Sequence, residues 1–318
     1  MNVRLNGRNP GRTLVALLVT FFMGLAVSRP AMAGGKINVV ASTMDLSSLA
    51  NEVGGDRVNV LPIARGYQDP HFVEAKPSFL LNLRKADLLV VVGMQLEIGW
   101  LPPLINQCGN PKIQPSAQGY FDASQVAEIL EIPTAQVSRA MGDVHPLGNP
   151  HYWLDPKNGL RVAEGLAQKL SQMSPGDSGY FHQRLEDFKK RLMAAEARWD
   201  EQMKPYRGRK VITYHQSWPN FLKRFGLQVA DYVEPRPGIP PSPAHVVELI
   251  SLMKRQNVKL ILVEPYFDLK TPQSVARETG GQVVVLMPSV GGNKDTGDYI
   301  KLFDYDVDLL VKAFQQAR

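Results

Sequence analysis

Along most of the chain, short apolar runs alternate with longer stretches in which apolar residues recur every three or four positions. The first pattern predicts buried β-strands, and the second predicts amphipathic helices. Continuous apolar strands separated by helices indicate parallel sheets covered on both faces. We therefore predict an α/β fold of two lobes, each with a mainly parallel sheet flanked by helices. The predicted strands are 37–42, 58–64 and 87–93 in the first half and 210–215, 227–233, 259–265 and 282–288 in the second.

One long rigid helix is predicted between the two halves. The segment 178–206 carries apolar side chains at helical spacing. These are Phe181, Leu185, Phe188, Leu192 and Ala195. The predicted organisation is an N-terminal α/β lobe over 34–177, a linking helix over 178–206 and a C-terminal α/β lobe over 207–318. An ordinary surface helix between two successive domains is the alternative interpretation.

The first 33 residues have the pattern of a secretory signal peptide. A basic, acid-free start leads into the apolar run 13–27, and small residues follow at Ala31 and Ala33. A membrane anchor is the alternative, but the run is shorter than the roughly 20 apolar residues that a spanning helix needs. No cysteine closes the apolar run, so we do not expect a lipid anchor. We predict cleavage after Ala33 and a periplasmic mature protein.

Charge and cysteine content argue against a nucleic-acid-binding protein and against a fold held by disulfides. The formal net charge of the whole chain is +6, and residues 1–33 carry four arginines and no acid, so the remainder has +6 − 4 = +2. The mature chain shows no clustered lysines and arginines of the kind that contact nucleic acid. Cys108 is the only cysteine, which rules out an internal disulfide.

Three histidines stand in similar settings. His71 lies in "YQDPHFVEAKP", His151 lies in "GNPHYWLDP", and His215 ends the predicted strand 210–215. In open α/β sheets, ligands bind outside the carboxyl ends of the strands. One loop histidine alone is more often a packing or capping residue, but three in matching contexts favour a metal site. Three neutral imidazoles suit a borderline-soft divalent ion, zinc first, with a carboxylate or water completing the shell.

Four segments are distinctive when taken together. They read "DPHFVEAKPSFLLNLRKADLLVVVGMQLEIGWLPPLI", "NPHYWLDPKNGLRVAEGLAQKL", "VITYHQSWPNFLKRFGLQVADYVEP" and "HVVELISLMKRQNVKLILVEPYFD". In this order they resemble the periplasmic solute-binding proteins of zinc- and manganese-type ABC importers, the cluster A-I or cluster 9 family. The resemblance implies two lobes joined by a single rigid helix. It also implies capture of a divalent metal ion between the lobes and its delivery to membrane permease subunits, without catalysis. His71, His151 and His215 fall on the family's three main ligand positions, and we expect a monomer.

The fourth ligand departs from the family pattern. The family usually supplies an Asp or Glu after the last strand of the second lobe, where this chain has Met287, Pro288 and Ser289. Glu264, at the end of a predicted strand, is our tentative fourth metal ligand. It could equally orient another ligand or cap a helix, in which case Asp295 or a water molecule would complete the shell.

Further polar residues have weaker claims. Many zinc-selective relatives carry a long His- and acid-rich insertion before the second ligand, but here His145 is the lone candidate for an auxiliary role, and an ordinary loop histidine is the simpler interpretation. His182 and His245 are expected to be structural. Glu74 could orient the His71 ring, or it could favour the start of the following helix.

Three functions remain to be weighed. A metal carrier requires neutral imidazoles, so its affinity falls as the pH drops through about 6.5. A zinc hydrolase requires an open water position, but the chain has neither an H-E-x-x-H pair nor a G-x-S-x-G elbow. A surface adhesin is disfavoured by the missing lipid anchor. We predict a carrier that binds zinc in preference to manganese or iron, because three imidazoles favour zinc.

Overall fold

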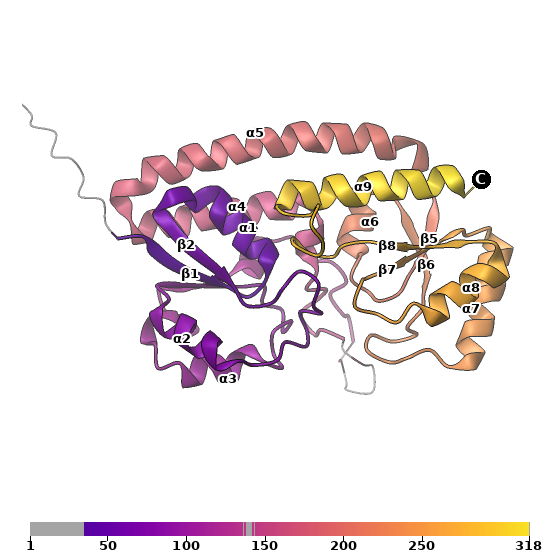
Figure 1. The fold of residues 1–318 in the computed structure, drawn as a ribbon, viewed down its shortest axis with the longest axis horizontal. Coiled ribbons are helices and arrows are strands. Elements are labelled where there is room, and N and C mark those ends of the chain that lie inside the picture. The colour runs from indigo at the N-terminus through magenta and orange to yellow at the C-terminus, as the bar shows by residue number, and fades with distance from the viewer. Residues whose placement is uncertain (1–34, 136, 138–141, 143, 318) are drawn as a thin grey trace, which may run out of the picture. The chain divides into compact units, whose positions relative to one another are not determined.

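The computed structural model describes residues 35–135, 137, 142 and 144–317. The predicted signal peptide, residues 1–33, lies outside this part of the chain. The described residues form two four-stranded parallel sheets, one in each half of the chain (Figure 1). The predicted α/β architecture is therefore confirmed.

Each sheet is fully parallel and has a crossover between its central strands. In the first, the order is β2-β1-β3-β4, and in the second it is β6-β5-β7-β8. The strands are β1 (Ile37–Ala41), β2 (Val58–Pro62), β3 (Leu88–Val91), β4 (Tyr120–Asp122), β5 (Lys210–Thr213), β6 (Gln228–Tyr232), β7 (Leu260–Val263) and β8 (Gln282–Val285). Strand β4 was not predicted, because it has three half-buried residues and no apolar run.

Helices cover both faces of each sheet, as continuous apolar strands require. They are α1 (Met44–Gly54), α2 (Pro77–Lys85), α3 (Leu101–Gln107), α4 (Pro156–Met173), α5 (Ser178–Met203), α6 (Pro219–Phe225), α7 (Pro243–Gln256), α8 (Lys270–Thr279) and α9 (Tyr299–Gln316). Short 3-10 helices are η1 (Gly55–Arg57), η2 (Pro111–Ile113), η3 (Ala123–Val126), η5 (Tyr152–Leu154), η6 (Pro175–Asp177) and η7 (Lys204–Tyr206). Helices α2 and α3 pack on one face of the first sheet in a separate apolar cluster, and α7 and α8 do the same on the second.

The predicted long helix is α5, which has 26 residues and spans about 39 Å at 1.5 Å per residue. It runs above both sheets, with α9 beside it (Figure 1). Its buried face contributes to one large core shared by α1, α4, α6 and α9. This face consists of Phe181, Leu185, Phe188, Leu192, Ala195, Trp199 and Met203. The helix therefore fixes the two sheets on a common core, while the lobe boundaries at 177/178 and 206/207 stay predictions.

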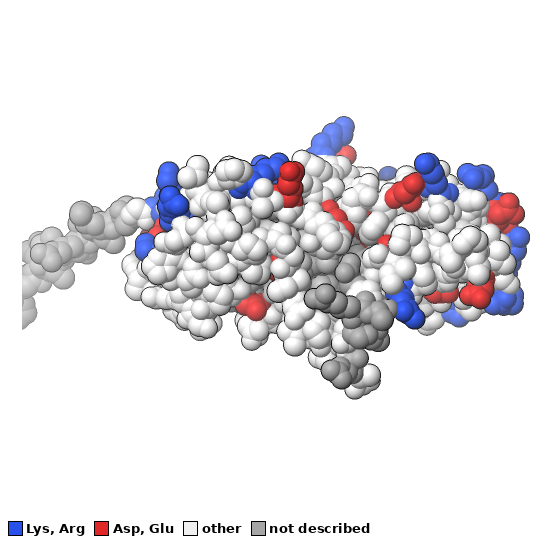
Figure 2. Space-filling model, turned by 90° about the horizontal axis from the view of Figure 1, so that it is seen from below, with Lys and Arg blue, Asp and Glu red and all other residues white. Residues whose placement is uncertain are grey.

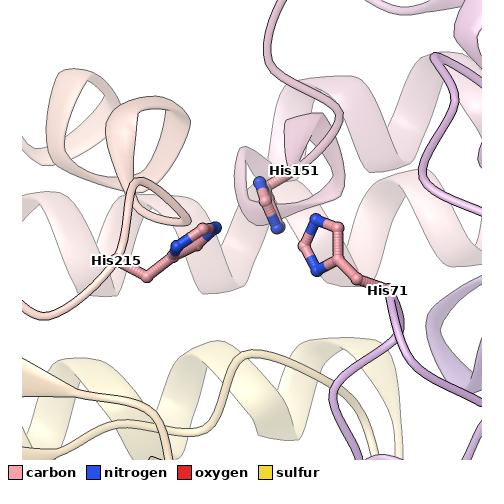
Figure 3. Close-up of side chains that lie close together, drawn as sticks. All are labelled: His71, His151 and His215. Atoms are coloured by element: carbon pink, nitrogen blue, oxygen red, sulfur yellow. The ribbon is translucent and has the colours of Figure 1, made fainter. Parts of the chain in front are cut away.

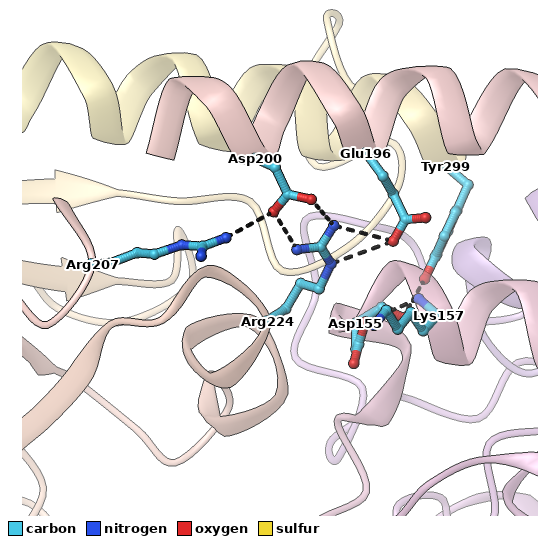
Figure 4. A network of polar contacts seen from close by, with 7 residues as sticks. All are labelled: Asp155, Lys157, Glu196, Asp200, Arg207, Arg224 and Tyr299. Carbon is cyan, nitrogen blue, oxygen red and sulfur yellow. Dashed lines mark hydrogen bonds and ion pairs between the residues drawn. The ribbon is translucent and has the colours of Figure 1, made fainter. Parts of the chain in front are cut away.

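An ionic network fastens α6 to α5. The Arg224 guanidinium donates to both oxygens of Asp200, at 2.7 and 3.1 Å, and to Glu196 Oε1 at 3.2 and 3.3 Å (Figure 4). The Arg224 side chain is only 9% exposed, so these charge-assisted bonds lie largely out of water. Helix α6 follows the loop of His215 directly, and the network therefore anchors that loop to the long helix.

The surface of the described part is mixed in charge. On the face shown in Figure 2, basic and acidic side chains are interspersed near the margins, and uncharged residues fill most of the middle. This face therefore presents no single-sign field that would attract a polyanion. Within the described ranges, no helix has both the length and the apolar character needed to cross a membrane.

Candidate metal centre

Three histidine rings from separate loops converge where the two halves of the chain meet. His71 follows β2, His151 directly precedes η5, and His215 follows β5. One ring nitrogen from each lies within 4.8 Å of the other two. The ring centroids are 5.1, 5.6 and 5.8 Å apart, and the rings face one another (Figure 3). The structure thus brings together all three histidines singled out in the sequence.

The two Pro-His steps build the same local structure. Asp69 Oδ1 accepts hydrogen bonds from the backbone N–H of His71 at 2.9 Å and from its ring Nδ1 at 2.7 Å. Asn149 Oδ1 accepts from the backbone N–H of His151 at 2.9 Å and from its Nδ1 at 3.0 Å. Each motif is an Asx turn in which the intervening proline limits the backbone. The residue two positions before each histidine therefore sets the direction of its ring.

His215 is oriented by a residue farther along the chain. Its Nδ1 lies 2.9 Å from Glu234 Oε2, and the same oxygen accepts the backbone N–H of Gly238 at 3.1 Å. Strands β5 and β6 are parallel neighbours, so the residues that follow them meet at one edge of the sheet. Thr213 Oγ1 donates to the His215 carbonyl at 2.9 Å and fixes the backbone there.

These contacts determine which ring nitrogen faces the centre. A carboxylate and an amide oxygen only accept hydrogen bonds, so Nδ1 carries the hydrogen in each ring, and Nε2 of the neutral imidazole keeps its lone pair. His151 Nε2 is buried and has no hydrogen-bond partner among the described residues. Such a nitrogen fits a metal ion, which needs lone pairs and no competing hydrogens.

Charges around the centre favour a bound cation. Burial, reinforced by the neighbouring His71 and His215, holds the pKa of His151 well below its usual range, so this ring stays neutral. Burial alone would raise the pKa of Asp69, but the hydrogen bonds that it accepts from His71 help to outweigh burial and lower that pKa. Asp69 is therefore ionised. With Glu234 behind His215, the centre has carboxylates on two sides.

Glu264, the tentative fourth ligand, is not part of this group of nitrogens. Its carboxylate is fully buried, and neither oxygen has a hydrogen-bond partner within the described ranges. Burial raises the pKa of Glu264 to about 8, although the polar side-chain groups of Ser217 and Trp218 nearby act to lower it. Asp295 is exposed, and its backbone N–H bonds to Asn293. Ligation by either residue stays a prediction.

The segment in place of the family carboxylate is engaged in packing. The Met287 backbone N–H donates to Asp306 at 2.9 Å, and Trp153 Nε1 donates to the Pro288 carbonyl at 2.9 Å. Ser289 donates its hydroxyl to Asp45. These contacts hold the loop after β8 against helices α1 and α9.

Sequence reasoning missed the residues that orient the rings. Glu74 was offered for this role, but it is exposed, and Asp69 orients His71 instead. Asp69 and Asn149 could have been found from the shared Asx-Pro-His pattern, whereas Glu234 has no local signal.

The remaining histidines are His145, His182 and His245. His182 and His245 bond to the backbone carbonyls of Ser178 and Tyr232, while His145 Nε2 lies 3.3 Å from His71 Nε2.

Comparisons with known proteins show which family the chain resembles over most of its length. The family described as ZnuA, zinc-uptake complex component A, periplasmic, matches residues 39–313. The chain is similar to the metal ABC transporter substrate-binding lipoprotein ScbA of Streptococcus cristatus, with 24% identity over 96% of this chain and 99% of that protein. It is also similar to the manganese ABC transporter substrate-binding lipoprotein PsaA of Streptococcus anginosus, with 23% identity over 96% of this chain and 100% of that protein.

The fold has close structural counterparts as well. A crystal structure of ZnuA superimposes with a TM-score of 0.74 at 24% identity, covering 87% of this chain and 99% of that chain. At 24% identity this structural likeness supports the fold alone. The family assignment rests on the sequence match over residues 39–313. The chain therefore belongs to the ZnuA family, whose members are substrate-binding proteins of metal ABC transporters and not enzymes.

Proposed function

We propose that this chain captures one divalent cation, zinc first, with Nε2 of His71, His151 and His215 as ligands. The observation that carries the proposal is the shared orientation of the three rings. Each Nδ1 is engaged with an oxygen acceptor, which leaves three Nε2 atoms facing one point. A structural role would need only packing, and it would not require Nδ1 to be engaged by an oxygen acceptor in all three rings.

The donor set supports zinc over manganese or iron. Neutral imidazole nitrogens suit zinc, whereas manganese prefers a larger share of oxygen ligands. Relatives carry names of either kind, since the matching family is described by zinc uptake and the PsaA relative by manganese. The nitrogen donors of this chain are therefore our reason for proposing zinc. Glu264 as a fourth ligand stays a prediction.

We further propose the route of the protein in the cell. Residues 1–33 would direct export and be removed, and the mature chain would act as a monomer in the periplasm. The ScbA and PsaA relatives are named as lipoproteins, but no cysteine closes the apolar run in this chain. The bound ion would pass to the permease subunits of an ABC importer.

The test is metal titration of the mature chain after chelator treatment, with zinc and manganese offered in parallel. We expect one zinc per chain, bound more tightly than manganese. His71→Ala and His215→Ala should each abolish stoichiometric binding, because either removes a nitrogen that the structure already orients toward the other two. His182→Ala, on the exposed side of α5, is the matched control. Stoichiometric zinc in both site variants would refute the three-histidine site.

A further inference from the structure

A fourth histidine stands beside the three that converge. His145 lies 74 residues from His71 along the chain, yet their Nε2 atoms are 3.3 Å apart and their ring centroids are 5.4 Å apart. Two nitrogens bound to one tetrahedral zinc at about 2.0–2.1 Å are themselves about 3.3–3.4 Å apart. The observed pair thus has the separation expected of two ligands of one ion.

His145 also shares a cavity with the rings of His151 and His215. A cavity of about 50 Å³ is lined by Glu131, His145, Asn149, His151, His215 and Gln216, among others. One water needs roughly 10–15 Å³ on this measure, so the space suits an ion and its immediate neighbours. His145 therefore faces the position that the proposed ion would take, and not bulk solvent alone.

The turn at residues 145–148 is tied down at several points. The His145 carbonyl accepts the backbone N–H of Gly148 at 3.2 Å, and the Asn149 N–H donates to the Leu130 carbonyl at 2.8 Å. Gly148 has φ +111°, and a Cβ there would lie 2.5 Å from Ile129. The Asn149 amide bridges to Gln216, next to His215, at 2.7 Å. The turn therefore holds His145 close to the loops of His151 and His215.

The other candidates for a fourth ligand are less well placed relative to the three histidine nitrogens. Glu264 and Asp295 lie outside the converging group, and the loop at Met287 is engaged with Asp306. His145 is outside the set of mutually close nitrogens too, because only its contact with His71 is short. A small swing of the ring toward His151 and His215, of the kind side chains commonly make on binding, would complete a tetrahedron.

We propose that His145 supplies the fourth ligand, so that the ion is held by four imidazole nitrogens and no carboxylate. This proposal rests on the function proposed above. A shell of four neutral nitrogens fits zinc and the neighbouring late transition ions, and it disfavours manganese, which prefers oxygen. The charge of the ion would be balanced by Asp69 and Glu234, which bind the ligand rings and not the metal. His145 would therefore set metal selectivity.

The decisive experiment counts imidazoles by zinc K-edge X-ray absorption on the zinc-loaded mature chain and on His145→Ala, with His182→Ala as control. We expect four imidazoles in the unaltered chain and in the control, and three in His145→Ala. Competition with a chelator should show weaker zinc binding in His145→Ala, by more than the roughly 10- to 100-fold that loss of an orienting partner costs. Three imidazoles in all three proteins would overturn the proposal.

A second variant keeps the test sharp. His145→Asp replaces the nitrogen with the carboxylate that the family usually supplies, so the ratio of zinc to manganese affinity should fall relative to the unaltered chain. An unchanged ratio would contradict a ligand role for residue 145. These outcomes concern His145 only, because His71→Ala and His215→Ala test the remaining site. An unaltered chain that binds neither metal would instead remove the proposed function.

Discussion

Asp69 accepts hydrogen bonds from both the backbone N–H and the ring Nδ1 of His71, so one carboxylate fixes the turn and the direction of the ring together. Asp69→Ala should weaken zinc binding by about 10- to 100-fold, the usual cost of losing a partner of a metal-bound histidine. Asp69→Asn should cost less, because Asn149 performs the same task for His151. Competition titration with a chelator measures both variants. Equal affinity of Asp69→Ala and the unaltered chain would show that ring orientation does not matter.

A pH dependence of stability is expected from Asp45, which accepts the backbone N–H of Val290 at 2.9 Å. Burial raises its pKa from 3.8 to about 7. Between these values the folded state binds more protons than the unfolded state, so the free energy of unfolding falls as the pH rises from about 4 to about 7. The contribution is on the order of a few kcal/mol.

The variant Asp45→Asn isolates this effect, because the amide keeps an acceptor for Val290 and does not ionise. Urea unfolding of the metal-free protein at pH 5 and pH 8 should show a smaller loss of stability in the variant than in the unaltered chain. The other buried acids are common to both proteins and cancel in the comparison. Identical losses in the two proteins would mean that Asp45 does not titrate in this range.

Gly66 marks a close approach of the loop before His71 to the loop after β8. A Cβ at this position would lie 2.0 Å from the Val290 carbonyl oxygen and 2.6 Å from the backbone of Gly291 and Gly292. Gly66→Ala should therefore displace one backbone, costing about 1–3 kcal/mol of stability and weakening metal binding. Thermal unfolding and zinc titration measure these effects. Gly297→Ala, where no atom lies within 4 Å, is the control, and equal behaviour of the two variants would contradict the contact.

The Arg224 network should matter for stability because it anchors α6 to α5 (Figure 4). Arg224→Ala leaves Glu196 and Asp200 without their shared partner, and we expect a loss of about 1.5–3 kcal/mol, the range for hydrogen bonds to charged groups. Chemical denaturation measures it. Lys204→Ala removes an exposed pair with Glu201 and should change stability by less than about 1 kcal/mol. A loss no larger than in this control would show that the network contributes only as a surface pair does.

Hydrophobic pattern predicted most of the fold because it is a local property. Every predicted strand contains an observed one, since buried parallel strands are continuous apolar runs. The long helix was visible for the same reason, through the regular spacing of its buried face. Strand β4 was not predicted because Tyr120–Asp122 is short and half-buried. Its place beside β3 comes from tertiary pairing and not from any pattern of its own.

The candidate site was predictable only in part. The three histidines stood out because each lies in a loop at a strand end or a helix start, where α/β sheets bind ligands. The partner of His215 depends on β5 and β6 being neighbours, which the sequence does not state. The approach of His145 to His71 depends on the path of a loop 74 residues away. Contacts of this kind depend on the assembled fold, so they cannot be predicted from the spacing of residues in the sequence.

The converging Nε2 atoms also have a consequence for how long the protein survives. An ion that binds only the folded form adds stability, about 2.7 kcal/mol at a free concentration one hundred times its dissociation constant. Differences of this size change the fraction of chains open to proteases several-fold. Metal scarcity would thus shorten the lifetime of idle carriers, and the amount of carrier would follow the supply of its cargo.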